Sequence, residues 1–238
     1  ERLIEEGVLI RDNEPAFFLY RLTMDGRTQT GFVMTADVGE YDQNIVRKHE
    51  YTRPDKEDDR VRNIEALAAQ SGNVFLAHRD HATLSEVTNL TLAEQRLYDI
   101  EAVDGIRHEV WKIAATHNSA ILGAFEELGP IYIADGHHRS AAASRVAKLP
   151  TAAEDAQRFL VVSFPESELK IWDYNRVVDD LHGLSEVDFL EALKKIGELR
   201  EVSAPENKRH EVSLYLARKW YQLAFSSDLI DESDPVAR

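Results

Sequence analysis

The chain has 238 residues, of which 43% are hydrophobic and 30% charged, and its 43 acidic against 28 basic side chains give a net charge of −15. This composition is typical of a globular protein, and the negative charge opposes generic binding to nucleic acid or to an anionic membrane surface. The chain contains no cysteine, which excludes disulfides, iron–sulfur clusters and thiolate zinc sites; no haem, flavin or structural zinc is expected.

The sequence also predicts where the protein resides. No apolar run approaches the roughly 18 residues of a membrane span, and the N-terminus does not place a basic segment before a hydrophobic one. Together with the absence of cysteine, this favours a cytoplasmic protein with no membrane partner. Because the chain lacks an initiator methionine, we expect a fragment of a longer protein, with parts missing upstream and downstream.

The first half of the chain predicts two β-hairpins, each turned at an Asp-Gly dipeptide, which is a strong hairpin signal. Pro54 is expected to break any helix in the charged region around it, so the next helix should begin at Asp58 or Asp59 and stop at Gly72. In chain order, the expected elements are a helix at 1–9, strands at 16–20 and 30–36, a helix from 58 or 59 to 71, a strand at 74–77, and strands at 97–102 and 106–113.

The second half mixes helices and strands irregularly. The expected elements are a helix at 118–128, a strand at 131–134, a helix at 140–146, strands at 159–164 and 169–178, a helix capped by Ser185, and a hairpin of strands 211–217 and 220–225. No internal repeat or low-complexity linker marks a boundary. We therefore predict a single α+β domain over residues 1–238, with a mixed sheet, several hairpins and packed helices.

The stretch Asp135–Arg139 stands where a strand gives way to a helix. The first N–H groups of a helix have no internal acceptor and the helix dipole is positive there, so an anion is favoured. Gly136 lets the backbone approach the anion, His137, His138 and Arg139 supply side-chain donors, and Asp135 could cap the helix or hold a metal or a hydroxyl. The alternative is structural: Asp135 caps, Arg139 is solvated, and the histidines pair with backbone carbonyls.

A second polar stretch runs from Lys48 to Arg60. A solvated, self-neutralising loop is the default interpretation of such a charge run. Yet it combines a histidine, a hydroxyl, an arginine before a proline and a carboxylate cluster, which could line a polar cleft and bind Mg²⁺ through oxygens. Its candidate site residues are His49, Glu50, Thr52, Arg53, Asp58 and Asp59.

The sequence does not favour a zinc site at the adjacent histidines or the sites marked by several well-known motifs. Neighbouring histidines on a helix diverge by about 100°, so His137 and His138 are not expected to share one zinc ion. The sequence has no Gly-x-x-x-x-Gly-Lys-Ser/Thr, Gly-x-Gly-x-x-Gly, Gly-x-Ser-x-Gly or His-Glu-x-x-His motif. The folds that carry those motifs are therefore not favoured.

The stretches 48–60 and 132–139 resemble the bacterial family labelled domain of unknown function 1015, and the likeness extends from about residue 1 to about residue 225. The Asp-Gly-His-His-Arg stretch of that family in turn looks like the phosphate-handling turn of the ParB and sulfiredoxin superfamily. The resemblance implies a ParB/sulfiredoxin-like core. Some relatives in this wider group are free-serine kinases, which transfer a phosphoryl group from ADP or ATP to the hydroxyl of L-serine.

The resemblance implies a small-molecule phosphotransferase that would use ADP or ATP with Mg²⁺ and form O-phosphoserine. The catalytic residues would be Asp135, His137 and Glu50, the last replacing a glutamate that the kinases carry in their upstream part. The expected phosphate-binding residues are Gly136, His137, His138, Arg139, His49, Thr52 and Arg53. The expected Mg²⁺ ligands are Asp135, Asp58 and Asp59.

Two other activities of the superfamily are disfavoured. Sulfiredoxin chemistry needs a thiol, which this chain lacks, and a DNA clamp is opposed by the negative charge. A different class stays open: a sensor or scaffold domain that binds a nucleotide or phosphorylated metabolite at the same turn without catalysis. The sequence also allows a homo-oligomer.

Overall fold

The computed structural model describes residues 2–10, 12–173, 175–206, 208–231 and 233. Where the sequence led us to expect one domain, the chain divides into two compact units, Glu1–Lys170 and Ile171–Arg238. Each unit has its own sheet. Within the described ranges, no helix combines the length and the apolar content needed to cross a membrane.

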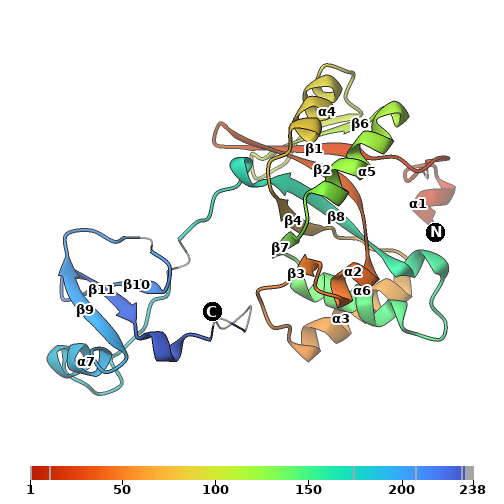
Figure 1. Cartoon of the computed structure of the whole chain (residues 1–238). Helices are drawn as coiled ribbons and strands as arrows, with labels where there is room; N and C mark the ends of the chain where they lie inside the picture. Colours follow the sequence, from red (N-terminus) through yellow and green to blue (C-terminus); the bar gives the residue numbers. More distant parts are fainter. Residues whose placement is uncertain (1, 11, 174, 207, 232, 234–238) are drawn as a thin grey trace. The chain divides into compact units, whose positions relative to one another are not determined.

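The first unit is built on an eight-stranded mixed sheet with the order β3-β7-β4-β8-β2-β1-β6-β5 (Figure 1). The pairs β3–β7 and β4–β8 are parallel, and the other neighbouring pairs are antiparallel. The strands are β1 Phe18–Met24, β2 Arg27–Asp37, β3 Val46–Arg47, β4 Val74–His78, β5 Tyr98–Glu101, β6 Arg107–Lys112, β7 Ile131–Asp135 and β8 Arg158–Pro165. The predicted α+β class with a mixed sheet is confirmed.

Helices α2 and α6 pack on the sheet as one group and α4 and α5 as another, whereas α3 contacts α6. The α-helices are α1 Arg2–Glu5, α2 Val38–Asp42, α3 Pro54–Leu67, α4 Ala82–Leu92, α5 Asn118–Glu127 and α6 His137–Ala147, with 3₁₀ turns at Ala115–His117, Glu154–Gln157 and Glu166–Glu168. One core joins α2 and α6 to β4, β7 and β8, and another joins α4 and α5 to β1, β2 and β6. Figure 1 shows these groups at different ends of the sheet.

The approach of α6 to the sheet follows from its small residues. Ala141, Ala142 and Ala143 are buried, and because an alanine side chain is short, the helix axis can lie close to the strands beneath it. This close packing fixes the start of α6, at His137, against the end of β7.

Several local predictions were wrong or incomplete. The helix expected at 1–9 spans only Arg2–Glu5, and the helix expected to stop at Gly72 ends at Leu67. Helix α3 begins at Pro54 rather than after it, because at the first helical position the missing N–H of proline would have had no acceptor anyway. The described residues of 169–178 form no strand. Helices α2 and α4 and strand β3 were not predicted.

The second unit contains α7 Glu186–Leu193 and a three-stranded antiparallel sheet in the order β10-β11-β9. Its strands are β9 Gly197–Val202, β10 Glu211–Leu216 and β11 Lys219–Phe225, and a 3₁₀ turn follows at Ser227–Leu229. The cap predicted at Ser185 is confirmed: its hydroxyl accepts the backbone N–H of Asp188 at 3.2 Å. The predicted last hairpin is also confirmed, and it turns at Ala217 and Arg218, both with positive φ.

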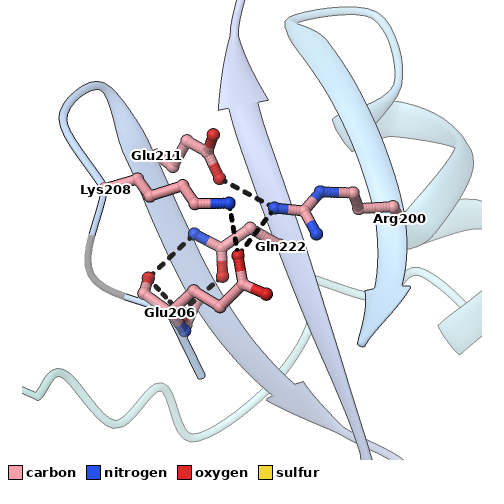
Figure 2. A network of polar contacts seen from close by, with 6 residues as sticks. Arg200, Glu206, Lys208, Glu211 and Gln222 are labelled. Atoms are coloured by element: carbon pink, nitrogen blue, oxygen red, sulfur yellow. Dashed lines mark hydrogen bonds and ion pairs between the residues drawn. The ribbon is translucent and has the colours of Figure 1, made fainter. Parts of the chain in front are cut away.

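A network of polar contacts joins side chains of the three strands and of the connection between β9 and β10 (Figure 2). The fully buried Gln222 donates from Nε2 to the backbone carbonyl of Glu206 at 3.1 Å. The carboxylate of Glu206 contacts Arg200 at 3.1 Å and Lys208 at 2.6 Å, and these cations hold the pKa of Glu206 below its usual range, the bond to Lys208 first. The network ties the connection between β9 and β10 to the sheet.

Candidate functional site

The turn between β7 and α6 leaves the start of the helix without a side-chain cap. Gly136 precedes the helix with φ of +101°, and no side chain caps the helix there. The N–H groups of Arg139 and Ser140 donate to the carbonyl of Gly136 at 2.9 and 3.0 Å, whereas the amides of His137 and His138 are among those that a helix leaves without an internal acceptor. Any Cβ at position 136 would lie 3.2 Å from Cα of Val74, so the turn is pressed against β4.

Asp135 does not cap this helix, contrary to one of the two roles expected for it. Its Oδ2 accepts from Nη2 of Arg139 at 2.7 Å instead. Nη1 of Arg139 donates to the carbonyl of Asn73 at 2.6 Å. Arg139 thus links the end of β7 to the segment before β4, and it leaves the first amides of α6 uncovered by a carboxylate of the turn.

The two adjacent histidines bind the second polar stretch of the sequence. Nε2 of His137 accepts the backbone N–H of His49 at 3.4 Å, and Nε2 of His138 accepts that of Arg53 at 3.2 Å. The structural alternative expected bonds to carbonyls, but these partners are donors. A ring nitrogen that accepts a hydrogen bond carries no proton, so the ring proton of His137 lies on Nδ1. The segment 49–53 is therefore held against the start of α6.

His137 also faces Glu50. Its Nδ1 lies 3.3 Å from Oε2 of Glu50, and its ring meets the ring of His49 edge to face at 4.5 Å between centroids. The His137 side chain is only 2% exposed, while that of Glu50 is 57% exposed. Burial, and after it the neighbouring His49, lowers the pKa of His137 below its ordinary value. At neutral pH the ring is therefore uncharged, and it orients a carboxylate that solvent can reach.

The helical part of the charged stretch docks on α6 through ion pairs. Oγ1 of Thr52 donates to the carboxylate of Glu57. Arg145 of α6 contacts Glu57 at 3.1 Å and Asp58 at 2.7 Å. Arg53 pairs with Asp55 at 2.8 Å. The stretch is thus largely self-neutralising, as its charge run predicted, but it packs against α6 rather than extending into solvent.

The carboxylates proposed as metal ligands do not converge. Asp58 pairs with Arg145, Asp59 lies 3.9 Å from both Arg60 and Arg62, and Asp135 pairs with Arg139. Over the part of the chain that the structure describes, no group of three or more His, Asp or Glu side chains is placed to hold a metal ion. Any Mg²⁺ bound at this turn would need ligands from its substrate.

A comparison with known protein families gives one match, described as protein of unknown function (DUF1015), over residues 1–238. The chain belongs to the DUF1015 family. Searches of curated proteins and of solved structures give no match. In this DUF1015 chain, the two stretches on which the resemblance rested are the ones that the histidines bring into contact.

Two groups of residues near the site were missed from the sequence. Arg145, which binds the charged stretch, stands two helical turns after His138 on α6, and this spacing was a usable signal. Arg60, Asn63 and Ser71, which the sequence did not single out, line a cavity of about 290 Å³ together with the predicted Arg139. This cavity depends on tertiary packing that no local pattern reveals. A cavity of about 1350 Å³, lined mainly by apolar side chains such as Leu122 and Phe125, touches none of the predicted site residues.

Proposed function

We propose that this DUF1015 protein is a small-molecule phosphotransferase of the free L-serine kinase type, built on a ParB/sulfiredoxin-like core. It takes a phosphoryl group from ADP or ATP and forms O-phosphoserine. One observation carries the proposal: the uncapped start of α6 and the segment 49–53 lie together because His137 and His138 bond the backbone of that segment.

The donor phosphates bind at the amides of His137 and His138, where the helix dipole favours negative charge. Gly136 supports this role because its positive φ, which glycine adopts without strain, lets the chain turn directly from β7 into the start of α6. Phosphoryl transfer depends mainly on positioning and on neutralising charge. A rigid turn with oriented N–H groups supplies both.

Glu50 is the proposed general base for the serine hydroxyl. Its carboxylate is exposed, and the Nδ1–H of His137 holds it from one side. His137 itself has both ring nitrogens engaged, one by His49 and one facing Glu50, so it cannot take the substrate proton. We therefore assign His137 to positioning and Glu50 to proton transfer.

Mg²⁺ fits this site as an ion shared with the nucleotide. Proteins commonly bind Mg²⁺ through one or two carboxylates, with phosphate oxygens and water completing the shell. Asp135 is the carboxylate at the turn, and Arg139 occupies only its Oδ2. When bound, the ion would neutralise charge on the phosphates.

The decisive experiment incubates the full-length protein with L-serine, Mg²⁺ and either ADP or ATP, and follows O-phosphoserine by ³¹P NMR. The proposal predicts O-phosphoserine with at least one donor. A second candidate function is a nucleotide sensor, which is favoured by the pairing of Asp135 and Asp58 with arginines. Nucleotide binding without product would select the sensor, and absence of both product and binding would reject the site.

A further inference from the structure

A small polar cavity lies between α3 and α6, next to the Asp135–Arg139 turn. Figure 1 shows the two helices beside each other, and they are in contact. The cavity measures about 290 Å³ and is lined by residues that include Arg60, Asn63, Ser71 and Arg139. Ligand pockets of proteins span about 300–1,000 Å³, so this one suits a phosphate group or a small amino acid rather than a whole nucleotide.

The polar groups around this cavity are mostly hydrogen-bond donors. No aspartate or glutamate lines it, although the chain has 43 acidic residues. Oδ1 of Asn63 accepts from the hydroxyl of Ser71 at 3.3 Å, which leaves the amide NH₂ of Asn63 to donate. Arg139 uses one N–H on Asn73 and one on Asp135, and the remaining donors of its guanidinium are available to a ligand.

Arg60 adds a second cation to the cavity, and its charge is only weakly balanced by a carboxylate of the protein. Its nearest carboxylate, on Asp59, is 3.9 Å away and the Arg60 side chain is 54% exposed, so this pair contributes little. Two guanidinium groups on one small cavity repel each other, and an anion between them removes that repulsion and accepts hydrogen bonds from both.

We infer that this cavity is a binding site for a small oxyanion, held by Arg60, Asn63 and Arg139. The identity of the oxyanion rests on the proposed function. It is either the terminal phosphate of the donor or the carboxylate of the amino-acid acceptor. Arg139 then connects this site to Asp135 and to the start of α6.

The test compares Arg60→Gln with Arg62→Gln in the full-length protein. Both changes remove one charge from α3, but Arg62 is 69% exposed and does not line the cavity. Calorimetric titrations use inorganic phosphate, ADP and L-serine in turn, after circular dichroism has shown that each variant is folded. The inference predicts that Arg60→Gln lowers the affinity for at least one of these ligands about tenfold or more, as expected for a lost hydrogen bond between charged groups. Arg62→Gln should leave the affinity unchanged.

The pattern of losses identifies the source of the oxyanion. Weaker phosphate and ADP binding assigns the cavity to the donor, and weaker L-serine binding assigns it to the acceptor. Asn63→Ala should lower the affinity for the same ligand. Equal affinities in the Arg60 and Arg62 variants, or no binding of any of the three by the unmodified protein, would overturn the inference.

The outcome is separable from that of the proposed function. O-phosphoserine formation with unchanged kinetics in Arg60→Gln would leave the kinase proposal intact and remove the oxyanion site. Loss of phosphate binding in Arg60→Gln, in a protein that forms no O-phosphoserine, would establish the site and remove the kinase proposal.

Discussion

Replacing Glu50 with glutamine is expected to slow O-phosphoserine formation by about 10²–10⁴-fold, the usual contribution of a positioned general base. The amide keeps the size of the side chain but cannot take up the serine proton. Nucleotide affinity should stay close to that of the unmodified protein, because the proposed phosphate contacts come from the start of α6. The rate is measured by ³¹P NMR, and the affinity by calorimetry.

The matched control is Glu86→Gln. Glu86 is exposed on α4, so this variant also loses one carboxylate, but outside the segment 49–53 and α6. It should leave the rate unchanged. A Glu50→Gln protein that forms O-phosphoserine at the rate of this control would show that the base lies elsewhere. A large loss of nucleotide affinity in Glu50→Gln would instead assign Glu50 to binding.

The stability of the first unit should fall by about 3 kcal/mol between pH 6.5 and pH 4 on account of His78. This side chain is buried, with Nδ1 at 2.7 Å from Oγ of Ser163, and burial lowers its pKa from 6.5 to about 4 despite the opposing charge of Asp80. The other groups facing it are His81, which also lowers the pKa, and the rings of Phe32 and Phe125.

The sign follows from which state binds the proton. Below pH 6.5 the unfolded chain protonates His78 and the folded chain does not, so unfolding becomes more favourable until the folded form also protonates near pH 4. The variant His78→Asn keeps a partner for Ser163 but cannot titrate. The difference in free energy of unfolding between wild type and variant, measured with urea, should therefore shrink as the pH falls from 7 to 4. A difference that is constant with pH would contradict a neutral buried His78.

The parts of the fold that the sequence predicted are those set by local chemistry. The Asp-Gly turn at Asp25-Gly26 has positive φ at both residues, as a two-residue hairpin requires, and Ser185 caps α7 as expected. The prediction at Pro54 was wrong because the effect of proline depends on its position. Proline breaks a helix when it stands in the interior and favours a helix when it stands at the first position. The order of strands in the large sheet depends on contacts between distant segments, which single-sequence patterns do not encode.

The two segments of the candidate site could be predicted from the sequence, but the hydrogen bonds that join them could not. The strand-to-helix turn at Asp135–Arg139 and the polar stretch around His49 were both identified from residue types. That the two histidines would accept backbone N–H groups from His49 and Arg53, 88 and 85 residues away, could not be deduced. The pairing of Asp135 with Arg139, four residues apart in sequence, follows a known spacing only for residues on one helix, and here it bridges a strand end and a helix start.

The central claim is that the start of α6, together with the segment 49–53, binds the phosphates of a nucleotide. The most direct test is an amide NMR titration of the ¹⁵N-labelled full-length protein with ADP and Mg²⁺. The account predicts that the amide signals of His137 and His138 shift most, followed by those of residues 49–53. Shifts confined to residues around the larger cavity, such as Leu122 and Phe125, with the amides of His137 and His138 unmoved, would contradict it.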